Sequence, residues 1–233
     1  MWLDWDTALS VLGHEPEIKL TYEALLSCFG IARRVFDVGA NYGVHSLLFL
    51  AHGVDVISFE PNPECHWYYP GLERDNQVKF RLEATALGAS ACRLDLWYPE
   101  RDSWLGTTDP KHMQVLSSRG ELRQLQVPCI TLDSYVKQSS LIPDLIKLDV
   151  EGSEFQILLG ASDTLEAFRP VIIFECWKNS VRDQIWGFLA ASNYVITGLP
   201  IVSRRGLHPL EESVFRHYPD TNFAALPKEA LQR

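Results

Sequence analysis

Short apolar runs typical of β-strands alternate with helix-like segments through most of this 233-residue chain. In chain order, the strand candidates of this kind are residues 33–37, 54–59, 77–82, 144–150 and 171–174. Between the first two, residues 42–52 repeat apolar side chains every three or four positions, which is the spacing of one helix face. Strands that alternate with helices form a mostly parallel sheet that is covered on both faces. The order of elements therefore predicts an α/β fold.

The alternation is interrupted between the third and the fourth strand candidates. Residues 92–98 and 125–132 each alternate apolar and polar side chains, and a long polar segment separates them. This pattern is typical of an antiparallel strand pair. We therefore expect residues 89–130 to form an inserted strand pair whose long loop is either functional or disordered.

The chain length suits one domain of about 100–200 residues, with or without a small insertion. We expect residues 1–30 to form a helical lead-in, interrupted at 13–16, and residues 31–233 to form the main domain. The remaining predicted elements are a helix near residues 181–191 and strands at 194–198 and 222–226.

Two helix starts carry local sequence signals. Asn62 is a good N-cap residue, and Pro63 suits the first helical position. Ser153, followed three residues later by Gln156, matches a capping box. We therefore expect helices to begin at both places.

The segment between the first strand and the next helix is the strongest indication of a ligand site. It reads Gly39-Ala40-Asn41-Tyr42-Gly43, and a glycine-rich turn between a strand and a helix lets a ligand approach the backbone closely. A dinucleotide fingerprint would read GxGxxG, but Asn41 stands where its second glycine would be. A pyrophosphate therefore fits this loop poorly.

Two acidic side chains flank this loop. Asp37 lies just before it, and a carboxylate there repels a phosphate but pairs with a cation. Glu60 ends the second strand, where an acid can bind two ribose hydroxyl groups. S-adenosylmethionine carries a sulfonium and an ammonium group and has no phosphate. Asp37, the loop and Glu60 together therefore favour a methyl-donor site over a redox-cofactor site.

Composition argues against several other classes of protein. The formal net charge is −9, from 21 basic and 30 acidic residues, which counts against nucleic acid as a partner. No run approaches the roughly 20 apolar residues of a membrane span, and the first ten residues lack the features of a signal peptide. The five cysteines are scattered without a CxxC pair. We therefore expect a cytoplasmic protein with buried free thiols and neither a disulfide framework nor a zinc site.

Several motifs occur in the order and approximate spacing found in the FkbM-type methyltransferases. They are VFDVGANYGVHS, VISFEPNP, ATALGAS, VPCITLDSYV and DLIKLDVEGSEFQILLGA, with a weaker TNFAALP near the end. The chain resembles this family of class I enzymes over about residues 35–175. The resemblance implies a doubly wound, Rossmann-like sheet and S-adenosylmethionine as the cofactor. It also implies methylation of a hydroxyl group on a natural product, a small metabolite or a sugar.

The resemblance assigns residues to the donor site. The residues of the donor loop are Asp37, Gly39, Ala40, Asn41 and Gly43. Glu60 would bind the ribose, Pro61 and Asn62 would flank the adenine or the ribose, and Glu83 would lie at the adenine edge.

Asp149 and Glu151 are the predicted catalytic residues. They lie in the KLDVEG corner, which faces the same crevice as the donor loop in an open parallel sheet. Methyl transfer to a hydroxyl group requires in-line alignment and the removal of one proton, which Asp149 or Glu151 would accept. Glu151 could instead pack at the start of the next helix. Asp149 and Glu175 could also supply two oxygen ligands for Mg²⁺, but nothing in the sequence demands a metal, so we predict none.

Three further side chains have both a functional and a structural interpretation. Lys147 lies in an apolar strand, where a lysine needs a partner, and Glu175 on the neighbouring strand is the expected one. His45 could contact the donor, although a hydrogen-bonded histidine on a helix is the commoner case. Trp104 could line an acceptor pocket or anchor a mobile surface loop.

The sequence therefore predicts an S-adenosylmethionine-dependent O-methyltransferase that acts on a small-molecule hydroxyl acceptor. Two alternatives remain, and the sequence does not indicate an oligomeric state. An NAD(P)-dependent oxidoreductase is disfavoured because GxGxxG is missing. A non-catalytic module that binds S-adenosylmethionine is disfavoured because Asp37, Glu60, Asp149 and Glu151 are all present.

Overall fold

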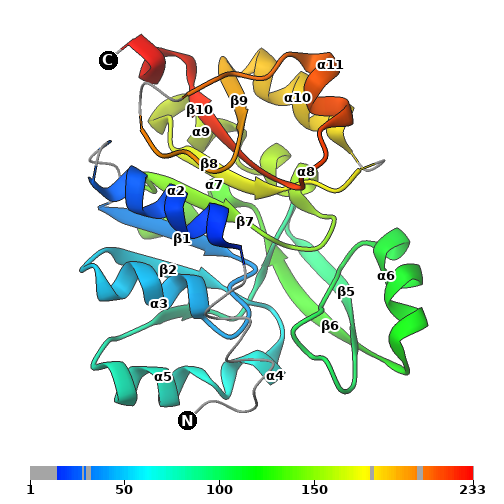
Figure 1. Cartoon of the computed structure of the whole chain (residues 1–233). Helices are drawn as coiled ribbons and strands as arrows, with labels where there is room; N and C mark the ends of the chain where they lie inside the picture. Colours follow the sequence, from blue (N-terminus) through cyan, green and yellow to red (C-terminus); the bar gives the residue numbers. More distant parts are fainter. Residues whose placement is uncertain (1–14, 28, 30–32, 179–180, 204–206, 233) are drawn as a thin grey trace.

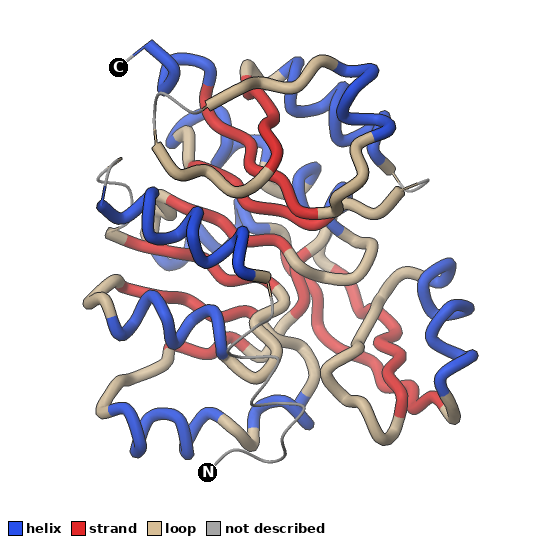
Figure 2. Tube along the Cα trace, viewed as in Figure 1, coloured by secondary structure: helices blue, strands red, loops and turns tan. Residues whose placement is uncertain are grey.

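The computed structural model describes residues 15–27, 29, 33–178, 181–203 and 207–232. Within these residues, a seven-stranded sheet forms the centre of the fold and a three-stranded sheet lies beside it (Figure 1). Helices flank the large sheet on both sides (Figure 2). The predicted α/β fold is confirmed.

The large sheet has the strand order β3-β2-β1-β7-β8-β10-β9. Its strands are β1 (Arg34–Val38), β2 (Asp55–Phe59), β3 (Arg81–Glu83), β7 (Leu145–Leu148), β8 (Val171–Glu175), β9 (Tyr194–Gly198) and β10 (Asn222–Pro227). The neighbouring strands β3, β2, β1, β7 and β8 are parallel to one another, whereas β10 runs antiparallel to both β8 and β9. The carboxyl ends of the five parallel strands, and the loops that follow them, therefore gather at one edge of the sheet.

Helices cover both faces of this sheet. They are α2 (Pro16–Ser27), α3 (Val44–Ala51), α4 (Pro63–His66), α5 (Tyr69–Asn76), α7 (Leu132–Ser139), α8 (Glu154–Leu159), α9 (Ser162–Phe168), α10 (Arg182–Ala191) and α11 (Glu212–His217), followed by the 3-10 helix η3 (Lys228–Gln232). Apolar side chains of α2 and α3 pack on one face, and those of α7 to α11 pack on the other. This is the doubly wound arrangement that the alternation of elements predicts.

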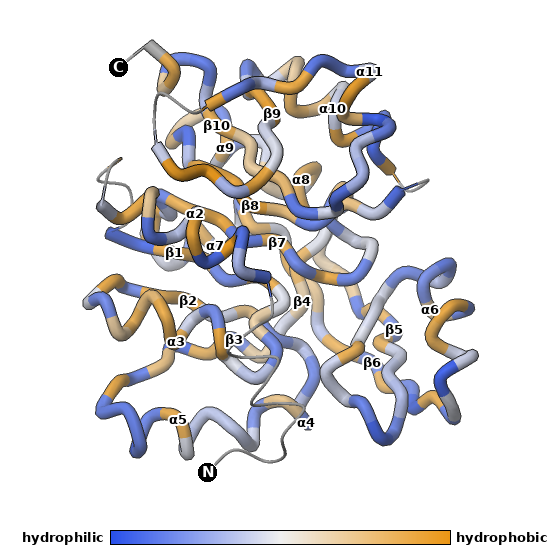
Figure 3. Tube along the Cα trace, in the orientation of Figure 1, coloured by the Kyte–Doolittle hydropathy of each residue, from blue (hydrophilic) through white to orange (hydrophobic). Residues whose placement is uncertain are grey.

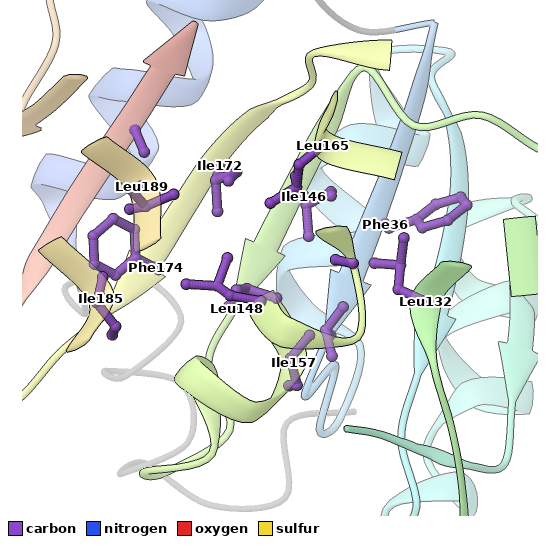
Figure 4. Close-up of a cluster of buried hydrophobic side chains, with 14 of the residues drawn as sticks. Phe36, Leu132, Ile146, Leu148, Ile157, Leu165, Ile172, Phe174, Ile185 and Leu189 are labelled. Carbon is purple, nitrogen blue, oxygen red and sulfur yellow. The ribbon is translucent and has the colours of Figure 1, made fainter. Parts of the chain in front are cut away.

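Two apolar clusters pack on the large sheet, one on each face. Successive side chains of a strand point to opposite faces, so Val35 of β1 joins the cluster under α2 and α3, and Phe36 joins the other. In Figure 4, Phe36, Ile146 and Phe174 from the strands meet Leu132 and other side chains from the covering helices. Hydrophobic stretches mark the strands of the large sheet, whereas hydrophilic stretches lie on many of the connections outside it (Figure 3).

The three-stranded sheet contains the predicted antiparallel pair. Its strands are β4 (Ala86–Leu87), β5 (Cys92–Pro99) and β6 (Leu122–Ile130), in the order β4-β6-β5, with α6 (Pro110–Leu116) and the 3-10 helix η1 (Ser117–Arg119) between β5 and β6. β5 and β6 pair antiparallel along their whole length. We call residues 89–130 the insertion. It projects from the large sheet beside the ends of β1 and β7 (Figure 1).

One predicted strand start was wrong. β3 begins at Arg81 rather than at residue 77, because Gln77 adopts a left-handed conformation with φ of 56° and ends α5 there. The lead-in helix is described only as α2, and residues 1–14, 28 and 30 of the predicted lead-in lie outside the described residues.

The predicted capping box at Ser153 is also wrong. The hydroxyl of Ser153 shares a hydrogen bond with Thr108, at 2.8 Å. The carboxylate of Glu154 instead accepts the backbone N–H groups of Val150 and Gly152, at 3.3 and 3.2 Å. An acid inside the corner therefore fixes this turn.

The cysteines largely follow the prediction. Cys65, Cys129 and Cys176 are buried free thiols, whereas Cys92 is exposed, and Cys28 lies outside the described residues. Within the described part of the chain, every helix is too short or too polar to span a bilayer.

Candidate active site

The loop of residues 39–43 leaves β1 at the carboxyl edge of the large sheet. Gly39, Asn41 and Gly43 all have left-handed backbones, with φ of 78°, 53° and 81°. A Cβ atom at position 39 would lie 1.8 Å from the carbonyl oxygen of Asp149, so only glycine allows the loop to approach the corner after β7. The 39–43 loop and the KLDVEG corner are therefore in direct contact.

Glu60 ties the 39–43 loop to the end of β2. Its Oε2 accepts the backbone N–H of Asn41 at 2.8 Å, and its Oε1 accepts that of Asn62 at 2.7 Å. Burial raises the pKa of Glu60 to about 7, although the two N–H groups act in the opposite direction. Each carboxylate oxygen has a further lone pair that can accept a ligand hydroxyl group.

A buried charge network lies behind the loop. Nζ of Lys147 is 2.9 Å from Oδ2 of Asp149 and 3.9 Å from Oδ1 of Asp37. Burial alone would lower the pKa of Lys147, but the charges of Asp149 and Asp37 outweigh it and raise that pKa above its ordinary value. Oδ2 of Asp37 accepts the hydroxyl of Ser46 at 2.6 Å, whereas Oδ1 has no hydrogen-bond partner among the described residues.

The predicted pairing of Lys147 with Glu175 is therefore wrong. Residues two apart on a strand point to the same face, which brings Lys147 to Asp149. Asp37 lies directly opposite Lys147 in the register of β1 and β7. Glu175 instead accepts the hydroxyl of Thr221 at 3.4 Å.

Asp149, Glu151 and Glu175 form a carboxylate cluster, with oxygens that lie within 4.8 Å of one another. Burial raises the pKa of Glu151 to about 7 and that of Glu175 to about 8, and the charge of Asp149 adds to both shifts. The structure thus brings together the two residues predicted for catalysis. Three carboxylates this close also occur without a metal ion, so metal-independent chemistry stays a prediction.

The insertion docks against the 39–43 loop through its own backbone. The side-chain amide of Asn41 donates to the carbonyl of Trp104, and that of Asn62 donates to the carbonyl of Ser103, both at 2.9 Å. The hydroxyl groups of Tyr42 and Ser103 lie 3.2 Å apart. The segment around Trp104 is therefore anchored by polar contacts on the loop.

The insertion also contacts the KLDVEG corner. Thr107 donates its hydroxyl to the carbonyl of Glu151 at 2.7 Å, and Nε2 of His112 lies 3.3 Å from Oε2 of Glu151. A Cβ atom on Gly152 would lie 2.9 Å from Oδ2 of Asp109. Sequence reasoning missed Asp109 and His112, because the polar segment shows no pattern that ties it to a distant corner.

The other residues predicted for the donor site lie on the 39–43 loop or near the ends of β2 and β3. Asn62 is buried and caps α4 by accepting the N–H of Glu64 at 3.1 Å, as predicted. Ala40 is buried within the 39–43 loop, and Pro61 is half-buried beside Asn62. Glu83 accepts the hydroxyl of Tyr135 at 2.8 Å, so its carboxylate is held toward α7. Their roles toward a ligand stay predictions.

His45 has contacts at both ring nitrogens. Nδ1 lies 3.1 Å from the hydroxyl of Tyr22, and Nε2 lies 3.3 Å from the carboxylate of Glu15. This geometry favours the structural interpretation of His45.

A hollow of about 430 Å³ opens near the end of β8. It is lined by Glu17, Leu199, Pro219, Asp220, Thr221 and Asn222. Asn222 is the register partner of Glu175, which places the hollow next to the end of β8. A second hollow, of about 320 Å³, lies beyond β3 and is lined by Arg81, Glu83, Tyr135, Gln138, Ser139 and Leu141.

Comparison with known families and curated proteins finds methyltransferases. The family model described as the methyltransferase FkbM domain matches residues 37–196. The chain is 26% identical over 145 residues to hexuronic acid methyltransferase AglP of Haloferax volcanii, and the match covers 60% of this chain and 54% of that protein. It is 27% identical over 220 residues to methyltransferase sdnD of Sordaria araneosa, covering 78% of this chain and 83% of the relative. The chain thus spans about half the length of the first relative.

A solved structure shares the fold. The crystal structure of methyltransferase FkbM from Methylobacillus flagellatus superposes with a TM-score of 0.52 at 16% identity. The match covers 83% of this chain and 43% of that one. At this identity the likeness shows the fold alone.

Proposed function

Because the chain belongs to the FkbM methyltransferase domain family, we propose that it is an S-adenosylmethionine-dependent methyltransferase that acts on a hydroxyl group of a small metabolite or sugar. The observation that carries the proposal is the joint placement of Asp37, the 39–43 loop and Glu60 at the carboxyl edge of the large sheet. Glu60 bonds the loop backbone, and Gly39 sits against the corner after β7. This is the place where ligands bind in open α/β sheets.

The residues at this edge of the sheet fit a cationic donor without phosphates. Oδ1 of Asp37 has no hydrogen-bond partner among the described residues, and an ammonium group would supply one. Glu60 keeps lone pairs for two ribose hydroxyl groups, and Asn62 would lie beside the ribose. When bound, S-adenosylmethionine would supply an electrophilic methyl group. Asn41, with its side chain on the Trp104 carbonyl, leaves no bare glycine backbone for a pyrophosphate.

The KLDVEG corner supplies the groups for the chemical step. Lys147 holds Asp149 at 2.9 Å and thereby fixes the corner beside Gly39. We assign proton removal to the groups around Glu151, where its carboxylate lies 3.3 Å from the imidazole of His112. Alignment of the hydroxyl oxygen with the methyl group would supply much of the rate.

The acceptor would enter from the hollow next to Glu175. Its lining of carboxylate, hydroxyl and amide groups offers many hydrogen bonds to a ligand rich in hydroxyl groups. One relative is named for a hexuronic acid, which supports a sugar as the acceptor. We therefore place sugars first among candidate acceptors.

The two alternatives make different predictions. An oxidoreductase would bind NAD or NADP at the 39–43 loop. A non-catalytic module would bind S-adenosylmethionine without turnover, which is hard to reconcile with a buried Lys147–Asp149 pair and a neighbouring Glu151.

The experiment is a transfer assay with S-adenosylmethionine carrying a ¹³C-labelled methyl group. Methyl glucoside, methyl glucuronoside and methyl glucosaminide are offered as acceptors, and NMR identifies the labelled atom. We expect a labelled methyl ether and a large loss of it in Asp37→Asn. Label on the amine of the glucosaminide alone would refute O-methylation, and bound but unconsumed donor would favour the non-catalytic module.

A further inference from the structure

One imidazole lies against the carboxylate cluster. His112, on α6 of the insertion, places Nε2 3.3 Å from Oε2 of Glu151, and its side chain is only 15% exposed. The ring of Trp177, two residues after β8, meets the ring of His112 edge-on, with centroids 5.6 Å apart. Thr107 holds the backbone of Glu151 from the same insertion, at 2.7 Å. The insertion thus delivers a histidine to the place where the corner after β7 and the end of β8 meet.

We propose that His112 takes the proton from the acceptor hydroxyl group and that Glu151 holds its imidazole ring for this step. The inference rests on the proposed function, because it names the base of that reaction. Glu151 then acts as a positioning residue, and the insertion carries part of the catalytic machinery.

The contact with Glu151 decides which ring nitrogen is available. A carboxylate next to one nitrogen of imidazole favours the tautomer with the proton on that nitrogen. Nε2, which faces Glu151, therefore carries the proton, and Nδ1 keeps its lone pair for the acceptor. Burial lowers the pKa of His112 below its ordinary value, Asp109 opposes this shift and Arg119 adds to it. The ring is therefore neutral at pH 7 and able to accept a proton.

The other groups of the cluster are less suited to the task. Asp149 is already engaged by Lys147 at 2.9 Å. Burial raises the pKa of Glu175 to about 8, so this carboxyl group is largely protonated at pH 7. Glu151 faces the imidazole itself. His112 is therefore better suited than these three acids to accept the proton.

The step balances with the groups named. The acceptor oxygen bonds to the methyl carbon, whose old bond leaves its electron pair on sulfur, while Nδ1 of His112 takes the hydroxyl proton. The products are a methyl ether, an uncharged thioether and an imidazolium ion. The charge of this ion faces the carboxylate of Glu151 at 3.3 Å, which stabilises it.

The first test reads the histidine without turnover. NMR titration follows the imidazole signals of the protein with and without bound S-adenosylhomocysteine, and the His112 signal is assigned by its loss in His112→Gln. We expect the pKa of His112 to lie below the ordinary value for histidine and Glu151→Gln to lower it further, because an adjacent anion is removed. The exposed His52 serves as the control, because Glu151→Gln should leave its signal as it is in the wild-type protein. If Glu151→Gln leaves the pKa of His112 unchanged, the proposed contact between His112 and Glu151 is refuted.

The second test uses the ¹³C-methyl transfer assay with the acceptor that the wild-type protein labels. His112→Ala should reduce kcat by about 10²- to 10⁴-fold, with the affinity for S-adenosylhomocysteine unchanged and with partial rescue by added imidazole. The matched control His52→Gln should behave like wild type. If Glu151 were the base instead, His112→Gln would keep the acid limb of the pH profile and Glu151→Gln would abolish it.

The outcomes separate the two claims. Folded His112→Ala and His112→Gln with wild-type kcat would overturn the role of His112 and leave the proposed function standing. If His112→Ala fails to fold, the pH profile of kcat in Glu151→Gln decides. An acid limb that shifts to lower pH supports His112 as the base, and loss of the acid limb refutes it. A wild-type protein that neither binds S-adenosylhomocysteine nor transfers a methyl group would refute the proposed function, and the role of His112 with it.

Discussion

Replacing Gly39 by alanine should destabilise the protein and abolish donor binding, whereas the same change at Gly53 should destabilise it less and leave donor binding unchanged. Both glycines have left-handed backbones, with φ of 78° and 73°. A Cβ at position 53 meets nothing within 4 Å, but one at position 39 would lie 1.8 Å from the carbonyl oxygen of Asp149. The pair of variants therefore separates backbone strain from steric overlap.

The expected cost follows from these contacts. The left-handed backbone alone costs about 1–2 kcal/mol in either variant. At position 39, the Asp149 carbonyl must also retreat by roughly 1 Å to reach the shortest distance of about 3 Å that real contacts show. That movement weakens the hydrogen bonds from Asp149 N to Val38 O and from Gly39 N to Phe59 O, both at 3.0 Å. Each is worth about 1 kcal/mol, so Gly39→Ala should cost about 3–4 kcal/mol in total.

Urea unfolding followed by tryptophan fluorescence measures this difference. We expect the free energy of unfolding to fall by about 2 kcal/mol more in Gly39→Ala than in Gly53→Ala, with a thermal midpoint lower by about 5 °C. Calorimetric titration should show wild-type affinity for S-adenosylhomocysteine only in Gly53→Ala. Equal stabilities of the two variants would refute the contact between the 39–43 loop and the corner.

Three further predictions concern the acids of the crevice. Glu60→Gln should weaken binding of S-adenosylhomocysteine by about tenfold or more in calorimetry. The reason is that the amide cannot accept both backbone N–H groups and two ribose hydroxyl groups, and each of these hydrogen bonds is worth about 1 kcal/mol. Unchanged affinity would remove Glu60 from the site. The pKa values of Glu60, Glu151 and Glu154 are raised to about 7 and that of Glu175 to about 8. The folded state therefore binds more protons than the unfolded chain between about pH 4.5 and 8, and the free energy of unfolding should fall as the pH rises through this range. The slope is about 1.4 kcal/mol per pH unit for each group that is protonated in the folded state and ionised in the unfolded chain. A free energy of unfolding that rises from pH 5 to 8 in urea unfolding of the ligand-free protein would contradict this. The preference for methyl glucoside over methyl glucuronoside should increase between pH 6.5 and 8.5 in competition assays, because Glu151 and Glu175 become negatively charged and repel the carboxylate of the glucuronoside. A preference that falls as the pH rises would place the acceptor elsewhere.

The regular part of the fold could be predicted because its signals are local and repetitive. The apolar runs around Val35, Ile57 and Ile172 show the pattern of strands, and each is buried in the large sheet. Asn62 and Pro63 begin α4 as expected, since an N-cap depends only on neighbouring residues. The antiparallel pair of the insertion followed from its alternating side chains.

The contacts that the sequence did not predict depend on the tertiary arrangement. Lys147 pairs with Asp149 and Asp37 rather than with Glu175, because strand register decides which acid lies opposite a lysine. His112 was missed since it stands alone in a polar segment and meets Glu151 only when the insertion folds back on the corner.

Thermal unfolding with S-adenosylmethionine, S-adenosylhomocysteine, NAD and NADP in separate samples tests the central claim most directly. A ligand that binds only the folded state adds about 2.7 kcal/mol at a hundredfold excess over its dissociation constant, which raises the midpoint by about 5–10 °C. The account predicts a shift with the two adenosyl ligands and none with the dinucleotides. A shift with NAD or NADP alone would contradict it, because the 39–43 loop would then bind a pyrophosphate.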